Sequence, residues 1–99
     1  MEAVASVLSR VLHRLGLENE ILGWRAVEEW PQVVGPRIAR HARAVSFREG
    51  TLVVEVDGSA WMQELSYLKR DLVRKANRHL GSELVRHVKF VIPRGGILR

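Results

Sequence analysis

The spacing of apolar residues predicts an amphipathic helix near the start of the 99-residue chain. Between residues 4 and 15, valine and leucine recur at i, i+3, i+4, i+7 and i+8, which places them on one helix face. Leu17 stands where a Schellman motif places its apolar contact, against Leu12, and Gly16 is typical of a left-handed C-cap. This first helix is therefore expected to end at Gly16.

A second helix is expected to begin at residue 18 or 19 and to carry its apolar face as far as Trp30. Pro31 disfavours helical geometry at the residue before it, so a break or kink is predicted at Trp30. A Gly-Pro pair at residues 35–36 interrupts the chain again, and a short helical turn is expected to follow as far as His41.

The apolar period then changes to two, which is typical of a strand with one buried face. Residues 44–48 and 51–57 alternate in this way, and Glu49-Gly50 between them predicts a tight hairpin turn. Residues 84–92 alternate again and predict a third strand. The sheet is therefore expected to contain three strands.

Residues 59–80 carry an apolar stripe at helical spacing, which predicts one long helix with Ser59 as its N-cap and Gly81 at its end. The element order is helix, helix, strand, strand, helix, strand. This order predicts an α+β domain whose three-stranded sheet is covered on one face by helices. We expect a single domain over residues 1–93 and a flexible stub over residues 94–99.

No pattern of catalytic or metal-ligating residues emerges from the sequence. The chain has no cysteine, and its four histidines lack metal-ligand spacing. Glu28 and Glu29 are adjacent in a predicted helix, so their side chains point about 100° apart and do not face one site. We therefore expect a protein that is not an enzyme and that has no cofactor, bound metal or small-molecule substrate.

The first segment of the chain does not resemble a secretory signal or a membrane span. It has no basic leader, and Arg10 and His13 interrupt its apolar run. An organelle transit peptide is the alternative interpretation of an amphipathic, arginine-containing start. We expect a cytoplasmic, nucleoid-associated protein without a membrane partner.

The formal net charge of +5 favours a polyanionic partner, and the placement of the basic residues is more informative than their number. Arg70, Arg74 and Arg78 are spaced at i, i+4 and i+8, so they form a row along one helix, and Tyr67 begins the same row. Such a row suits a single strand, with arginine on phosphates and tyrosine stacked on a base. A solvated helix face is the alternative. Further candidates for nucleic-acid contact are Arg37, Arg40, Arg43 and Lys89.

Two tryptophans receive opposite interpretations. Trp61 begins the apolar stripe of the long helix, so it is expected in the core or at its rim. Trp24 lies off the apolar face of the second helix and is the candidate for contact with a protein partner. The alternative for Trp24 is packing against the first helix.

Two motifs resemble those of the DciA family, the bacterial replicative-helicase operators. They are Trp-Pro-x-Val-Val-Gly over residues 30–35 and Ser-Ala-Trp-x-Gln-Glu-Leu over residues 59–65, within a resemblance that spans roughly residues 28–95. The resemblance implies a KH-like domain that binds DNA, single-stranded or forked, and assists loading of the replicative helicase in replication initiation. The matching residues serve as fold markers, and they are Trp30, Gly35, Leu52, Val54, Trp61 and Leu65.

The chain departs from the expected pattern in two respects. No two glycines have the spacing of the Gly-x-x-Gly loop with which a KH module clamps nucleotides, so any binding is expected to use the basic surface. Many family members add a basic extension, whereas this sequence ends at Arg99. The alternative functions are a protein–protein adaptor without catalysis and a KH-like RNA-binding protein.

Overall fold

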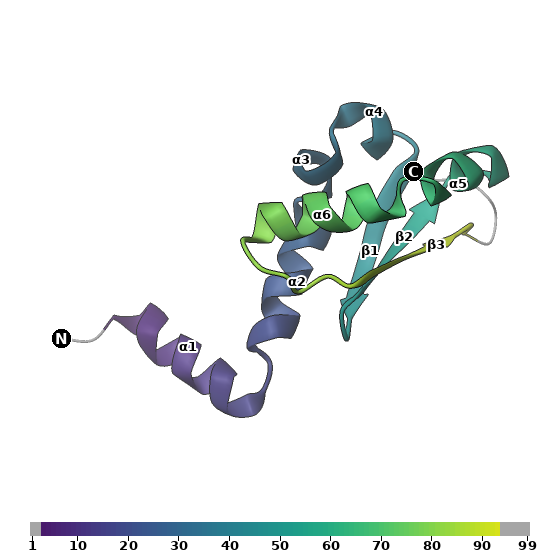
Figure 1. Ribbon diagram of the computed structural model, residues 1–99. Coiled ribbons are helices and arrows are strands. Elements are labelled where there is room, and N and C mark those ends of the chain that lie inside the picture. The colour runs from purple at the N-terminus through teal and green to yellow at the C-terminus, as the bar shows by residue number, and fades with distance from the viewer. Residues whose placement is uncertain (1–2, 94–99) are drawn as a thin grey trace.

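The computed structural model describes residues 3–93, which contain six helices and three strands (Figure 1). The helices are α1 (Val4–Leu15), α2 (Glu18–Glu28), α3 (Trp30–Val34), α4 (Pro36–Ala39), α5 (Ser59–Ser66) and α6 (Lys69–Leu80). The strands are β1 (Ala42–Arg48), β2 (Thr51–Val56) and β3 (His87–Val91). The stub predicted at residues 94–99 lies outside the described residues.

The three strands form one mixed sheet in the order β1-β2-β3. Strands β1 and β2 pair antiparallel, whereas β2 and β3 pair parallel. The hairpin turn has positive φ angles of 48° at Glu49 and 84° at Gly50, the backbone of the predicted tight turn. The α+β class and the predicted element order are confirmed.

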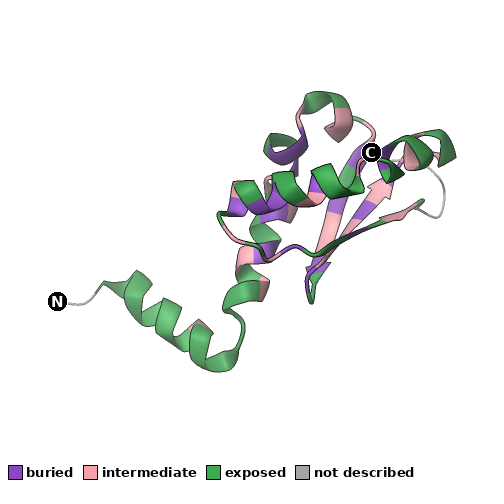
Figure 2. Cartoon of the chain, in the orientation of Figure 1, coloured by how far each residue is buried: buried purple, intermediate pink, exposed green. Residues whose placement is uncertain are grey.

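The core lies on one face of this sheet. The side chains of Leu52, Val54 and Val56 are fully buried beneath the helices, whereas the alternate residues of β2 are partly exposed (Figure 2). Because side chains alternate along a strand, one row faces the core and the other faces solvent. Among the described residues, the sheet therefore has one covered face and one open face.

Two contacts hold the second helix and the following turn against the sheet. The indole Nε1 of Trp30 donates a hydrogen bond to the carbonyl oxygen of Ala42 (3.1 Å), and Trp30 is only 2% exposed. Gly23 lies directly against the ring of Phe47, where a Cβ atom would overlap the ring. The missing side chain therefore permits the close approach of α2 to β1.

The break predicted at Trp30 is confirmed, because α2 ends at Glu28 and α3 begins at Trp30. The single helix predicted over residues 59–80 is wrong, since a turn at residues 67–68 divides it into α5 and α6. At the end of α5 the hydroxyl of Ser66 donates to the carbonyl oxygen of Met62 (2.7 Å), a bond that competes with regular helix geometry.

The predicted N-cap at Ser59 is also wrong, because the cap is Gly58 and Ser59 is the first helical residue. Gly58 has a φ of 148°, which glycine adopts without steric cost, and its carbonyl accepts the first helical bond from Met62. The third strand is shorter than predicted and begins at His87.

Helix α1 departs furthest from the sequence-based expectation. It was expected to join the helical layer over the sheet, but it extends away from the domain and no residue in it is buried (Figures 1 and 2). The molecule is consequently elongated, with extents of 53 × 26 × 22 Å. Its radius of gyration is 15.0 Å, against about 13 Å for a compact domain of this length.

A polar network ties the end of α6 to the junction of α2 and α3. One carboxylate oxygen of Glu29 lies 2.7 Å from His79 Nε2 and accepts a bond from Arg25 Nε (3.2 Å). Arg25 also donates to the backbone carbonyl of His79 (3.0 Å). The hydrogen bond from His79, with a smaller contribution from Arg25, lowers the pKa of Glu29 below its ordinary value of 4.5.

We predict that this network makes stability depend on pH in the acidic range. A carboxyl whose pKa is lower in the folded state stabilises the protein above its unfolded-state pKa. That contribution is lost as pH falls from about 4.5 through the folded-state value. Thermal melts should show Glu29→Gln less stable than the parent at neutral pH, with the difference vanishing in acid. The neighbouring Glu28→Gln is the matched control, and a Glu29→Gln difference that persists unchanged at pH 3 would contradict the prediction.

Candidate nucleic-acid interface

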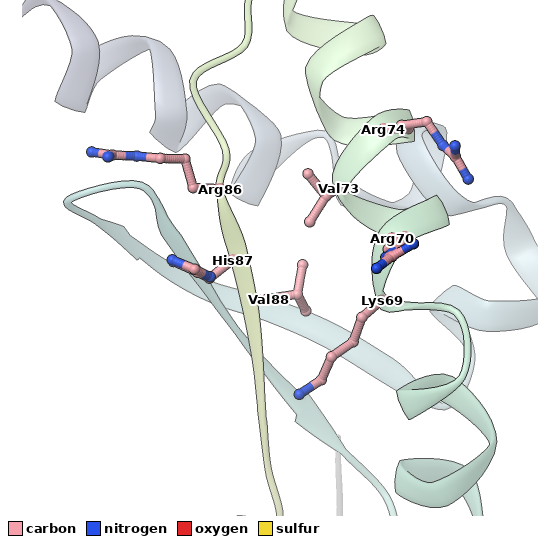
Figure 3. A pocket seen from close by; sticks show the side chains of 7 residues that line it. All are labelled: Lys69, Arg70, Val73, Arg74, Arg86, His87 and Val88. Carbon is pink, nitrogen blue, oxygen red and sulfur yellow. The ribbon is translucent and has the colours of Figure 1, made fainter.

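A cleft of about 400 Å³ opens between α6 and the start of β3 (Figure 3). Its lining consists of Lys69, Arg70, Val73 and Arg74 on α6, and Arg86, His87 and Val88 on the facing segment. Val73 and Val88 face one another between helix and strand, and Lys69 reaches across toward the strand. Arg86 and Arg74 point outward on opposite sides. The cleft therefore combines an apolar floor with a cationic rim.

The strand side of the cleft is positioned by a buried asparagine. The side chain of Asn77 donates to the carbonyl oxygen of Val85 (2.9 Å) and accepts from its N–H (2.7 Å). One residue later, the N–H groups of Arg86 and His87 both donate to the carbonyl oxygen of Gly50 (2.8 and 3.1 Å). These bonds fix the backbone that enters β3 against both α6 and the hairpin turn.

The electrostatics of the cleft favour an anion. Its described lining carries four permanent cations and no carboxylate. Arg74 is partly compensated, because it pairs with Asp71 at 2.5 Å. None of the ion pairs recorded within residues 3–93 includes Lys69, Arg70 or Arg86. The cations without a carboxylate partner among these residues therefore lie on both sides of the cleft, on α6 and at the start of β3.

The row predicted on the long helix is partly assembled in this cleft. Arg70 and Arg74 line it, while Arg78 lines an adjoining hollow that shares Arg74. Tyr67 does not belong to α6, because it caps α5 in the turn that precedes Lys69. It is 79% exposed and lies two residues before the first cation of the cleft. An aromatic beside a cationic row is thus present, although on a turn and not on the helix.

The other predicted contact residues lie on different surfaces. Arg43 and Lys89 lie on the open face of the sheet, where Arg43 pairs with Glu55 across the strands (3.0 Å). Arg37 and Arg40 are exposed on and just after α4. The structure therefore does not unite the eight predicted residues into one site.

The two tryptophans are distinguished by their surroundings. Trp61 is half-buried at the rim of the core, and its ring stacks on His41 with centroids 4.2 Å apart. His41 is held in turn by Asp57 at 3.0 Å. Trp24 is 42% exposed on α2 and lies away from the cleft-lining residues. Its role in partner binding stays a prediction.

Sequence reasoning missed Lys69, Arg86 and His87 as members of a site with the helical arginines. The signal that could have found them is the parallel pairing of β3 with β2. A helix that connects two parallel strands packs on them, which brings the first half of α6 beside the start of β3.

Residues 3–93 lack two features that define other classes of protein. That part of the chain contains no group of three or more histidine, aspartate or glutamate side chains arranged to hold a metal ion. None of its helices has the length and apolar character needed to cross a bilayer.

The fold and the cleft define a small basic α+β domain with one open sheet face and one cationic cleft. A family model described as "Dna[CI] antecedent, DciA" matches residues 3–90, and the chain belongs to this DciA family. Membership supports a replication-related role, in line with the resemblance found in the sequence.

Curated relatives carry the name "UPF0232 protein". One from Streptomyces avermitilis is 32% identical over 95 residues, covering 94% of this chain and 52% of the relative. One from Corynebacterium glutamicum is 25% identical over 92 residues, covering 93% of this chain and 52% of the relative. One from Mycobacterium tuberculosis is 34% identical over 76 residues, covering 77% and 38%. The chain thus spans about half or less of the length of these relatives.

We predict that Asn77→Ala lowers the free energy of unfolding by about 2 kcal/mol, because the N–H and carbonyl of Val85 lose their buried partner. Urea denaturation measures the change. Asn19→Ala, on an exposed position of α2, is the control and should change stability by less than about 0.5 kcal/mol. Equal stability of Asn77→Ala and the parent would show that other contacts hold the start of β3.

Proposed function

We propose that the chain is a DNA-binding accessory factor of the bacterial replicative helicase that acts in replication initiation. The observation that carries the DNA-binding part is the cleft between α6 and β3, with four cations and no carboxylate in its described lining. Membership of the DciA family supports the helicase part. On this proposal the protein contributes binding and positioning and has no catalytic step of its own.

The shape of the cleft favours a single strand over a duplex. Val73 and Val88 form a narrow apolar floor that suits a sugar or a base, while the outward-pointing arginines suit the flanking phosphates. Exposed Tyr67, next to the cationic end of α6, supplies a stacking surface for a further base.

The spacing of the cations along α6 also fits a single strand. Residues four apart on a helix are separated by a rise of about 6 Å, close to the distance between successive phosphates. Arg70, Arg74 and Arg78 can therefore follow a backbone past the cleft to the edge of the adjoining hollow, whose lining also contains Glu83. We assign the cations of the cleft to phosphates, and its described lining has no asparagine, glutamine or acidic side chain to read base edges. Binding is therefore expected to be independent of sequence.

We predict that Arg70→Ala with Arg86→Ala weakens binding of unrelated single-stranded oligonucleotides to a similar degree. Loss of two phosphate contacts should reduce the slope of log affinity against log salt by about 1.4. Fluorescence anisotropy at several salt concentrations measures both quantities. Arg37→Ala with Arg40→Ala is the matched control, because it removes the same charge from another surface.

The comparison of the two double variants decides between the surfaces. A larger loss of affinity and slope in the Arg37/Arg40 variant would move the DNA contact to α4. Equal losses in both would mean that net charge matters and the cleft does not. Circular dichroism of each variant checks that the fold is retained.

We predict that the tagged protein retains the replicative helicase from bacterial lysate after nuclease treatment, because the accessory role requires a direct protein contact. Mass spectrometry identifies the retained protein, and untreated lysate is the control. Loss of the helicase after nuclease treatment would show an association through DNA alone. Retention of the helicase by a chain without oligonucleotide affinity would favour the protein–protein adaptor.

A further inference from the structure

The apolar face of α1 is exposed except at Leu12, which is partly buried (Figure 2). The large apolar side chains exposed on it are Val4, Val7, Leu8, Val11 and Leu15, with exposed fractions between 42% and 83%. Isolated helices of about 12 residues are marginal in water, and an amphipathic helix is stabilised mainly by packing of its apolar face. The described residues of the chain supply no such cover for α1.

Helix α2 presents a second apolar stripe on the side away from the sheet. Leu17, Ile21 and Trp24 are spaced at i, i+4 and i+7, and all three are exposed. They lie opposite Gly23 and Ala26, which are buried against the domain. Helix α2 therefore has one buried apolar face and one exposed apolar face.

The two exposed stripes cannot close on each other within one chain without breaking the elbow between α1 and α2. The N–H of Leu17 donates to the carbonyl oxygen of Leu12 (2.9 Å), and Gly16 adopts a left-handed φ of 73°. The side chains of His13 and Glu18 bridge the elbow at 2.9 Å. These contacts hold α1 away from α2, so within residues 3–93 the two stripes do not cover each other.

We propose that the cover is a second copy of this chain, in a symmetric dimer in which α1 of each copy packs on the outer stripe of α2 of its partner. The two helices have matching lengths of 12 and 11 residues, about 18 and 16 Å. This exchange gives a closed dimer with twofold symmetry. In it the two apolar stripes of each chain are covered by the partner.

Charge decides which helices face each other. Helix α1 carries two arginines and one histidine and no carboxylate. Helix α2 carries Glu18, Glu20 and Glu28 and a single arginine, Arg25, which pairs with Glu29. Packing α1 on α1 of the partner would oppose like charges, whereas packing α1 on α2 opposes unlike charges. The charges therefore favour the exchanged arrangement.

The area available is sufficient for a stable dimer. The exposed parts of the eight apolar side chains in the two stripes amount to roughly 700 Å² per chain and about 1,400 Å² in a pair, within the range of specific interfaces.

The test is the mass of the 99-residue chain in solution, measured without nucleic acid by sedimentation equilibrium over a range of concentrations. The expected result is a concentration-dependent mass that approaches twice the 11.3 kDa of one chain. Leu8→Glu should weaken the dimer by ~10-fold or more, because it places a carboxylate in the apolar contact. Leu8 is 54% exposed in the single chain, so the substitution should leave the fold intact. Ser9→Glu, which adds the same charge on the other side of α1, is the matched control and should dimerise like the parent.

A mixing experiment distinguishes the exchanged arrangement from other pairings. Leu8→Glu and Ile21→Lys should each dimerise poorly alone. Their equimolar mixture should dimerise, because one contact then pairs glutamate with lysine and the other contains neither substitution. A mixture that stays monomeric would overturn the exchanged arrangement.

Other occupants of the stripes would also overturn the proposal. A mass of 11.3 kDa at every concentration means that a second copy does not cover α1. Binding of the monomer to anionic vesicles, abolished by Leu8→Glu, would assign the face to a membrane surface. None of these measurements involves DNA or the cleft, so their failure leaves the proposed function standing.

Discussion

The parallel pairing of β3 with β2 is the constraint on which the rest of the domain depends. Parallel neighbours need a crossover connection, and here it consists of α5, the turn at residues 67–68, and α6. The crossover lies on the helical side of the sheet, so the inner residues of β2 become core and the outer residues stay open. It also lays the first half of α6 beside the start of β3. The cleft is thus a direct consequence of the topology.

Four cations gather around this cleft without a carboxylate in its described lining. On the surrounding surfaces, Arg43 pairs with Glu55 and Arg25 with Glu29, whereas Arg37 and Arg40 are in none of the ion pairs recorded within residues 3–93. Around the cleft, only Arg74 has a recorded carboxylate partner. Two like charges about 8 Å apart in water repel by about 0.5 kcal/mol, a cost that a folded domain tolerates. A phosphate between them reverses the sign of the interaction and releases counterions. An arrangement that is slightly unfavourable alone therefore favours an anionic ligand.

The local elements were largely predictable from the sequence, because each has its own signal. The period of the apolar residues predicted the helices and strands, Gly16 and Gly81 marked helix ends, and Pro31 marked the break before α3. The turn inside residues 59–80 was missed, since a serine bonded to the preceding helical turn leaves the apolar period unchanged.

The site was predictable only in part, because it is built from residues distant in sequence. Helical spacing identified Arg70 and Arg74 as neighbours, but the contribution of Arg86 depends on strand pairing and on the bonds of Asn77. Likewise, the amphipathic pattern of α1 predicts an apolar face that packs against something, but it does not identify the partner of that face. The cleft and the exposed stripes lie on different elements, so self-association through α1 and α2 leaves the cleft of each copy available. In such a dimer, a strand that is bound in one cleft is held near the second cleft at a high effective concentration. A strand long enough to reach both clefts would therefore bind more tightly than a short one, without any new contact.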